Sequence, residues 1–422
     1  MSWENQCKQT SFYLQQMKKR IPEDNILRII DEKIDFSFIN ELTKPYYSRL
    51  GPIGYSPERL FRMLIVMYME NIPSERKLVE QLNENMRYMY FTKTDMDDSI
   101  PDHSTFSVLR NRLGDELFKE IFQRIVMSII DLGIAHPKSI SVDSSSVLAD
   151  VKVPHKQDKD VTLNGRQIIS PNDPDARFGH TSPKKGFFGY KAQVMVDNDS
   201  ACILNIDAKP GNFEDHNIEE EFIQKPIENN HLTPREAALD RGFDNYRLRR
   251  FFKRQRIKAA IPVKLTKHDK SKFYKKEHFK IDLKNRKATC PANKELKYLG
   301  FNNKRLIYEF VGTTCNSCKL KTQCTAGQAR RLSIHKDYML REKAIMFNKT
   351  RRYKAIFKKR CCIERVIGEA KRFHGMFRAK FRSLWKLKIQ FYLTAIAINL
   401  KRIAIFFIKQ QNIRTIALKT GP

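Results

Sequence analysis

The hydrophobic periodicity of the chain changes at Pro137, and this change limits the folds that the sequence can adopt. Between residues 56 and 133, apolar residues recur at spacings of three and four, as in amphipathic helices. After Pro137, residues 139–147 alternate polar and apolar side chains, as in a strand with two different faces. The sequence therefore predicts an all-helical region followed by a domain built on a sheet.

Helix signals are clear from Ser56 onward. Ser56 precedes a proline and a glutamate, which favours a helix N-terminus there. A second helix is predicted from Ser74, and a third, capped by Ser104, is predicted to run to Gly133. Residues 1–50 give only a weak pattern.

The pattern beyond Pro137 predicts an α/β fold with a mixed sheet. Residues 188–197 and 201–208 are predicted to form a hairpin, and polar residues 152–185 a loop. A helix (215–227), a strand (236–239) and a second helix (246–256) follow. Residues 257–345, with Lys-rich short strands and four cysteines, are interpreted as an insertion, and residues 342–408 as helical. The sequence thus predicts a helical N-terminal domain (1–136), a core in two parts (137–256 and 346–410) and an insertion between them (257–345).

Positive charge is confined to the second part of the chain. The net charge is +32, yet residues 1–138 carry 19 Lys+Arg against 20 Asp+Glu. Residues 241–288 hold 18 against four, and residues 341–388 hold 17 against three. A folded body this basic repels itself unless a polyanion neutralises it, so the composition favours binding to nucleic acid. A ribosome-like structural protein and a surface charged for solubility are the alternatives.

No segment indicates secretion or a membrane anchor. The N-terminus lacks a basic stretch followed by an apolar core, and the apolar stretch 389–400 is shorter than the about 20 residues of a membrane span. Eight cysteines in this context favour reduced thiols or metal ligands over disulfides. The sequence predicts a soluble, cytoplasmic protein without a membrane partner.

Three acids have the positions that phosphodiester chemistry requires. Two Mg²⁺ ions can activate a nucleophile and stabilise the leaving oxygen, and Mg²⁺ prefers carboxylate ligands. Asp143 lies on the first predicted strand, Asp240 follows the strand 236–239, and Glu364 lies on the basic C-terminal helix. Taken singly, each acid could instead be a capped, solvated or ion-paired residue.

Glu364 stands between two cations on one helix face. Arg360, Glu364 and Lys371 have the spacing i, i+4 and i+11, which is close to three helical turns. A glutamate placed between cations suits a site where metal and DNA phosphate meet.

At these motifs the chain resembles the DDE-type transposases of bacterial insertion sequences. Asp143 followed by two serines is similar to the family's first aspartate, and Asp240-Arg-Gly-Phe to its second-aspartate motif. Arg360, Glu364 and Lys371 match its Tyr-x2-Arg-x3-Glu-x6-Lys signature, except that Phe357 replaces the tyrosine; Tyr353, one turn earlier, is a candidate substitute. The resemblance covers about residues 50–405.

The resemblance implies a fold and a reaction. It implies a ribonuclease-H-like core that uses Mg²⁺ to cleave transposon ends, after which the freed 3′-hydroxyl attacks target DNA. Asp143, Asp240 and Glu364 would hold two Mg²⁺ ions, Arg360 and Lys371 would hold phosphate, and Lys191 is a further candidate phosphate contact. The partners would be double-stranded DNA and a second copy of the chain. A non-catalytic DNA-binding protein and a general nuclease of the same fold are the alternatives.

The cysteines of the insertion form a separate candidate site. Cys290, Cys315, Cys318 and Cys324 have the pattern C-x24-C-x2-C-x5-C. They can hold a structural Zn²⁺ or remain unliganded thiols, and both interpretations stay open. Cys361 and Cys362 are interpreted as helix packing, and His103 and His374 as hydrogen-bonded structural histidines.

Overall fold

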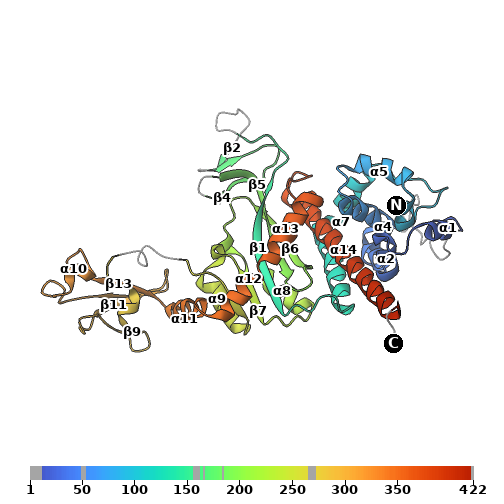
Figure 1. The fold of residues 1–422 in the computed structure, drawn as a ribbon. Helices are drawn as coiled ribbons and strands as arrows, with labels where there is room; N and C mark the ends of the chain where they lie inside the picture. Colours follow the sequence, from blue (N-terminus) through green and yellow to red (C-terminus); the bar gives the residue numbers. More distant parts are fainter. Residues whose placement is uncertain are drawn as a thin grey trace. The chain divides into compact units, whose positions relative to one another are not determined.

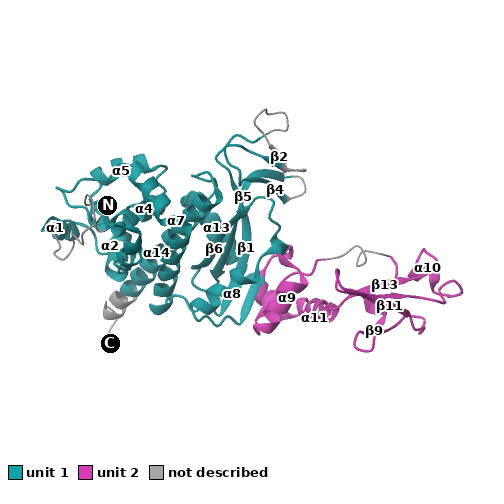
Figure 2. Cartoon of the chain, turned by 180° about the vertical axis from the view of Figure 1, so that it is seen from behind, with its two compact units in different colours: residues 1–238, 358–422 teal, residues 239–357 magenta. Residues whose placement is uncertain are grey.

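The computed structural model describes residues 12–48, 54–154, 162–164, 167–182, 185–264 and 272–419. By their internal contacts these residues divide into two compact units, residues 1–238 with 358–422 (unit 1) and residues 239–357 (unit 2), coloured separately in Figure 2. The domain borders predicted at residues 136, 256 and 345 stay predictions.

Unit 1 begins with a helical region (Figure 1). The three predicted helices are confirmed as α4 (Pro57–Met69), α5 (Glu75–Glu84) and α7 (Ser104–Asp131). The weak pattern before residue 50 concealed α1 (Phe12–Arg20), α2 (Ile26–Lys33) and α3 (Phe38–Thr43), and α6 (Met86–Thr92) was also not predicted. These helices have 6 to 9 residues, too few turns to repeat a periodic pattern clearly.

The predicted caps are correct only in part. Ser74 caps α5, because its Oγ accepts a hydrogen bond from Lys77 N at 3.2 Å. Ser56 is at the N-cap position of α4 but makes no side-chain cap; its Oγ donates to Asn40 Oδ1 instead. Ser104 is the first residue of α7 and not its cap: His103 stands at the N-cap position and makes no side-chain cap. Asp102 Oδ1 accepts a hydrogen bond from Ser104 N at 2.8 Å.

The sheet of unit 1 is built on two long antiparallel strands, β1 (Ser139–Leu148) and β5 (Lys185–Asp197). β6 (Ile203–Pro210) and β4 (Arg177–Ser182) also pair with β5, and β7 (Glu236–Leu239) lies next to β1. The hairpin and the strand 236–239 are thus confirmed. Gly189 has φ +152°, and a Cβ there would meet Val147 O at 2.2 Å, so β1 and β5 approach closely only because this residue is glycine.

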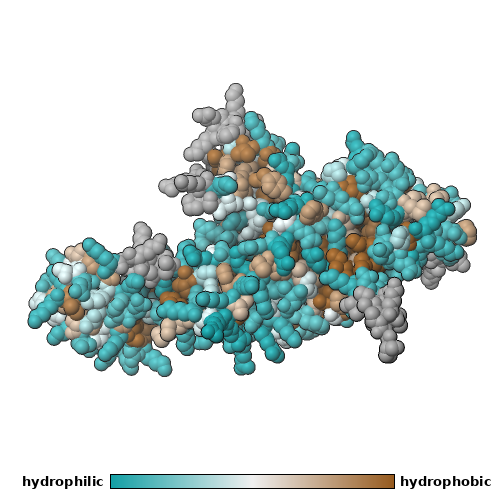
Figure 3. Space-filling view, in the orientation of Figure 1, coloured by the Kyte–Doolittle hydropathy of each residue, from teal (hydrophilic) through white to brown (hydrophobic). Residues whose placement is uncertain are grey.

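The prediction of a loop over residues 152–185 was wrong. Its described part contains the hairpin β2 (Thr162–Asn164) and β3 (Gln167–Ile169), together with β4. Phe178 of β4 packs on Phe188 of β5 at 4.9 Å between ring centroids. Apolar side chains gather around the β4 region on the face drawn in Figure 3. Strands of three residues are too short to show alternation, which explains the error.

The helices beyond the sheet complete unit 1. η2 (Asp215–Asn217) and α8 (Glu220–Asn229) replace the single predicted helix 215–227, and α13 (Cys361–Phe373) packs on β1 and β5. α14 (Leu384–Lys419) packs on α7, β6, α4 and α2. By length and composition its residues 384–412 could cross a membrane, but 67% of the most apolar window is buried inside the protein. The apolar stretch 389–400 is therefore the buried helix that was predicted.

Unit 2 contains two kinds of structure. Helices α9 (Tyr246–Arg254), α11 (Tyr338–Asn348) and α12 (Arg351–Lys358) accompany β8 (Lys258–Ala260). A strand-rich lobe contains the hairpin β9 (Lys280–Asp282) and β10 (Lys287–Thr289), the sheet β11 (Lys297–Asn302), β12 (Ile307–Val311) and β13 (Arg331–His335), and the short α10 (Lys321–Cys324). The expected short strands are confirmed.

Candidate active site

Two of the three predicted acids meet on one arginine. Arg360 Nη1 donates to Asp143 Oδ2 at 2.8 Å, and Arg360 Nη2 donates to Glu364 Oε1 at 2.5 Å. Asp143 and Arg360 lie 217 residues apart in the chain, so folding alone brings them together. The side chain of Glu364 is 55% exposed, against 19% for Asp143 and Arg360, so the cluster opens to solvent on the glutamate side.

The cluster is held by a strand and by the start of a helix. Asp143 lies in the middle of β1, opposite Val194 of β5, and its Oδ1 accepts a hydrogen bond from Ser144 N at 2.8 Å. Arg360 is the N-cap residue of α13, and Glu364 lies in the first turn. An acid is stabilised at that end by the partial positive charge of the helix N-terminus. The opposite face of α13 is buried through Ile363, Val366, Ile367 and Ala370, which fixes the helix on the sheet.

The third acid, Asp240, belongs to unit 2. It is the residue that directly follows β7, the strand next to β1, and it precedes the short helix η3 (Arg241–Phe243). Within unit 2, Tyr353 stacks on Phe357 at 5.6 Å between ring centroids. Burial raises the pKa of Tyr353; the charges of Arg249 and Arg241 oppose this rise, and that of Asp240 adds to it. The candidate substitute for the missing tyrosine is therefore within electrostatic range of Asp240.

A basic hollow that the sequence did not reveal adjoins Glu364. It has a volume of about 740 Å³. Besides Glu364, its lining includes the cations Arg365, Arg372, Lys401 and Arg402, and the aromatic Phe373, which is 59% exposed. Arg402 is ion-paired with Glu369. The density of cations on residues 360–402 was the available signal, but the sequence could not show which of them share a surface.

The two predicted lysine contacts differ. Lys371 is half-buried, burial lowers its pKa, and in the described part of the chain it forms no hydrogen bond or ion pair. Lys191 is paired with Asp215 at 2.9 Å. Because it lies three residues from Val194 on β5, strand alternation places it on the sheet face opposite to Asp143. The structure therefore does not bring Lys191 to the Asp143 cluster.

The far end of α13 is joined to the C-terminal end of α4. The ring of His374 is buried, and its Nδ1 donates to Tyr68 O at 2.7 Å. Lys401 Nζ donates to Met69 O at 2.7 Å, and Lys380 Nζ to Ile72 O at 3.2 Å. Cations at the last carbonyls of a helix are favourable, so these contacts fix the end of α4 to the end of α13, to α14 and to the segment between them. His374 is thus the structural histidine that was predicted, and burial lowers its pKa.

The other two predictions on single residues have mixed outcomes. Cys362 is buried in helix packing, as predicted, but Cys361 is exposed, so its interpretation as a packing residue was wrong. His103 is a hydrogen-bonded histidine, because its Nδ1 lies 3.1 Å from Asp102 Oδ2.

Comparison with known proteins addresses both ends of the chain. Residues 15–112 match the family model described as a transposase domain (DUF772). Residues 289–404, which include Arg360, Glu364 and Lys371, match the model described as a transposase DDE domain. The chain belongs to the DDE-type transposases. The second match does not reach back to Asp143 and Asp240, so their roles in this transposase rest on geometry and motif.

Further comparisons add little about the transposase. No curated protein matches the chain. A solved structure titled as the piggyBac transposase synaptic complex with hairpin DNA aligns with 96% of this chain and 77% of its own chain. At 12% identity and a TM-score of 0.33, this likeness carries no argument about the fold or the site.

Proposed function

We propose that this transposase cleaves DNA at the ends of its mobile element and joins the freed 3′-hydroxyl to target DNA, with Asp143, Asp240 and Glu364 as Mg²⁺ ligands. The observation that carries the proposal is the pair of carboxylates held by one guanidinium, Asp143–Arg360–Glu364. Two acids from distant segments that converge on a single positive charge form a site suited to a cation.

The chemistry of these groups fits Mg²⁺ in particular. Carboxylates are the hard oxygen ligands that Mg²⁺ prefers, and it keeps several waters. Glu364 is exposed at the edge of a hollow, which leaves room for such waters and for phosphate. Among the described residues no group of three or more His, Cys, Asp or Glu side chains is arranged to hold a metal, so the third ligand is assigned from the motif. When bound, Mg²⁺ would activate the attacking oxygen and stabilise the leaving oxygen.

Asp240 is the natural third ligand because of its place in the chain. It is covalently attached to the end of β7, which lies beside the strand that carries Asp143. The order of β6, β5, β1 and β7, with antiparallel pairing in the first three, also supports assigning the sheet to the ribonuclease-H-like folds. The proposed metal site and the proposed ribonuclease-H-like fold therefore support each other.

The cations around the cluster would hold DNA. A half-buried lysine whose pKa is lowered by burial gains most from a phosphate partner, because the anion offsets the cost of burying its charge. Lys371 is therefore assigned to a backbone phosphate, and Arg360 to a phosphate beside the carboxylates. Since two element ends must be held together, a homodimer on double-stranded DNA is the assembly that we propose.

A strand-transfer assay tests this function. The substrate is DNA that carries the sequences flanking the gene, incubated with Mg²⁺ and a target plasmid. Glu364→Gln and Asp240→Asn should each abolish both cleavage and joining. The exposed acid Glu221, paired only with Lys225 on the surface of α8, gives the matched control Glu221→Gln, which should retain activity.

The same assay separates the alternatives. Cleavage without joining would support a general nuclease. Binding without cleavage in the presence of any divalent ion would support a non-catalytic DNA-binding protein. Full activity of Glu364→Gln would disprove the metal-site assignment.

A further inference from the structure

The strand-rich lobe of unit 2 has a small hydrophobic core. Its seven buried residues are Phe279, Ala288, Leu296, Phe310, Leu332, Ile334 and Tyr338. Two cysteines, Cys290 and Cys324, pack against this core. Lobes with so little buried apolar surface commonly depend on a metal or a disulfide for stability. Among the described residues, the cysteines of this lobe are all free thiols.

Four cysteines from three segments of the lobe surround one cavity. Cys290, Cys315, Cys318 and Cys324 all line a cavity of about 30 Å³, within unit 2. This is enough room for a water molecule or a small ion. Residues separated by up to 34 positions in the sequence thus line one cavity.

The backbone around the cavity is shaped for sulfur ligands. Cys290 begins a tight turn in which Asn293 N donates to Cys290 O at 2.9 Å, and Asn293 has φ +55°. Cys318 N donates to Cys315 O at 3.3 Å, which closes a second turn between the two cysteines of the C-x2-C pair. Each turn directs a cysteine toward the cavity that both line.

The sulfur of Cys315 has a prepared environment. Arg330 N lies 3.4 Å from Cys315 Sγ, and a backbone N–H that donates to sulfur stabilises the thiolate form. Gly312 leaves the room for this sulfur, because a Cβ at residue 312 would lie only 2.4 Å from Cys315 Sγ. A cation bound among the four cysteines would balance the negative charge of their thiolates.

We propose that these four cysteines bind one Zn²⁺ ion that stabilises the strand-rich lobe. Zn²⁺ takes four thiolates in a tetrahedron, and a C-x2-C pair with two further cysteines is a usual ligand set for structural zinc. No three of the described side chains already stand as a metal site, so binding draws the sulfurs inward around the cavity and releases their protons to solvent. The site is separate from the carboxylate cluster and does not depend on the proposed reaction.

Metal analysis of the purified full-length protein tests the site. We expect about one equivalent of zinc per chain, and a value below about 0.3 would overturn the proposal. Replacing the metal with Co²⁺ should give the absorption bands of a tetrahedral thiolate complex, whereas an octahedral spectrum would reject it. Mass spectrometry of alkylated protein should find no disulfide among the four cysteines. If the purified protein contains no zinc and has a disulfide there, a disulfide and not a metal stabilises the lobe.

Single substitutions identify the ligands. Cys318→Ser should lose most of the bound zinc and lower the thermal midpoint of the lobe. Cys361→Ser is the matched control, because Cys361 is exposed and lies outside the lobe, and it should keep its zinc. If Cys318→Ser does not fold, the zinc content and the Co²⁺ spectrum of the unchanged protein still decide. Equal zinc content in both variants would contradict the assignment.

Discussion

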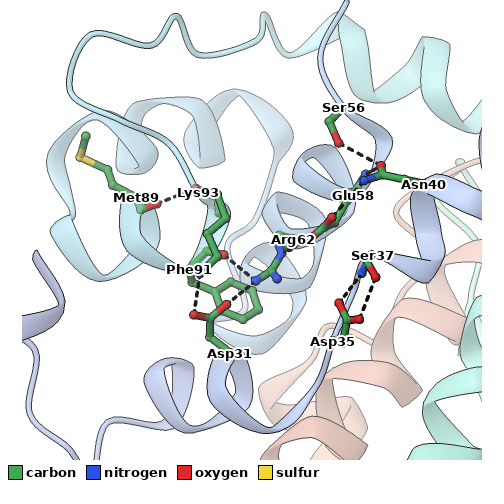
Figure 4. A network of polar contacts seen from close by, with 11 residues as sticks. Asp31, Asp35, Ser37, Asn40, Ser56, Glu58, Arg62, Met89, Phe91 and Lys93 are labelled. Atoms are coloured by element: carbon green, nitrogen blue, oxygen red, sulfur yellow. Dashed lines mark hydrogen bonds and ion pairs between the residues drawn. The ribbon is translucent and has the colours of Figure 1, made fainter. Parts of the chain in front are cut away.

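Unit 1 contains two arginine-centred acid clusters that differ in how completely they are closed. In the helical region, Arg62 binds Asp31 at 2.8 Å and Glu58 at 2.9 Å (Figure 4). The second oxygens of these two acids are bound by Lys93 and by Asn40, so all four oxygens have a partner. Arg62 also donates to Phe91 O. The carboxylate oxygens of this cluster are therefore all occupied, and none is left to bind a ligand.

The Asp143 cluster has the same composition but is left open. Arg360 again joins two acids, yet the Glu364 side chain is 55% exposed, against 20% for Glu58. In the described part of the chain Glu364 Oε2 has no hydrogen-bond partner. Buried charges are costly unless every group is paired, so a closed cluster serves stability and an open one can serve binding. The difference in closure is consistent with a structural role for Asp31 and Glu58 and with the metal-binding role that we propose for Asp143 and Glu364.

The largest expected difference between the clusters concerns activity. Asp143→Asn should lower strand transfer by about 10³-fold or more, because a metal ligand supplies several kcal/mol and each 1.36 kcal/mol is tenfold. Asp31→Asn should change the activity of the folded protein little. Rates measured at a temperature where both variants are folded check this, and similar losses in both would remove the distinction.

The free energy of unfolding should depend on the two clusters in the opposite order, more on the Arg62 cluster than on the Arg360 cluster. Arg62→Met should lower the free energy of unfolding by about 3–5 kcal/mol, because it leaves the buried carboxylate of Asp31 uncompensated. Arg360→Met should lower it by a smaller amount, since the glutamate side of its cluster is open to water. Urea unfolding of the two variants gives both values. A larger loss for Arg360→Met would mean that the open cluster is mainly structural.

DNA binding sharpens the comparison further, because α13, which carries Glu364 and begins at Arg360, also carries the proposed phosphate contact Lys371. Lys371→Ala should weaken binding to all DNA sequences alike. It should also reduce the slope of log affinity against log salt concentration by the amount expected for about one phosphate contact. Lys119→Ala on α7 is the control and should leave the slope unchanged. Titrations at several salt concentrations measure the effect, and an unchanged slope for Lys371→Ala would exclude the contact.

The pKa of Lys371 adds a pH dependence to this binding. Burial lowers this pKa, so the free protein loses the charge at a lower pH than an ordinary lysine would. Phosphate binds the protonated form, and affinity should therefore fall as pH rises through that lowered pKa. Lys371→Arg should remove this fall, because arginine stays charged. Equal pH profiles for the two proteins would contradict the assignment.

The smallest effect is expected at acid pH, in the closed cluster. Burial alone would raise the pKa of Asp31, but the charges and hydrogen bonds of Arg62 and Lys93 outweigh it and lower the pKa below 3.8. A lowered folded-state pKa gives stability that is present above the unfolded value and lost as pH falls through the folded one. Unfolding curves between pH 5 and 2 should show this loss in the unchanged protein and less of it in Asp31→Asn.

The periodicity of apolar residues predicted the helices and strands that are long enough to show it. Helix α4 and strand β1 were predicted because apolar residues recur at helical spacing in the first and alternate with polar residues in the second. The helices before residue 50 and the three-residue strands β2 and β3 were missed, since each is too short for periodicity to stand out from composition. The prediction of a cap at Ser104 was wrong by one residue: the helix begins at Ser104, and His103 stands at the N-cap position without a side-chain cap.

The sequence by itself determined the helical and α/β division, the position of the positive charge and the residue types available for metal and phosphate, because these depend on composition and local periodicity. Only the tertiary structure decided which of those residues meet. Register put Lys191 on the face away from Asp143, and packing of α13 on the sheet brought Arg360 to Asp143 across 217 residues. Contacts over such separations depend on the packing of the whole core, which no local stretch of sequence specifies.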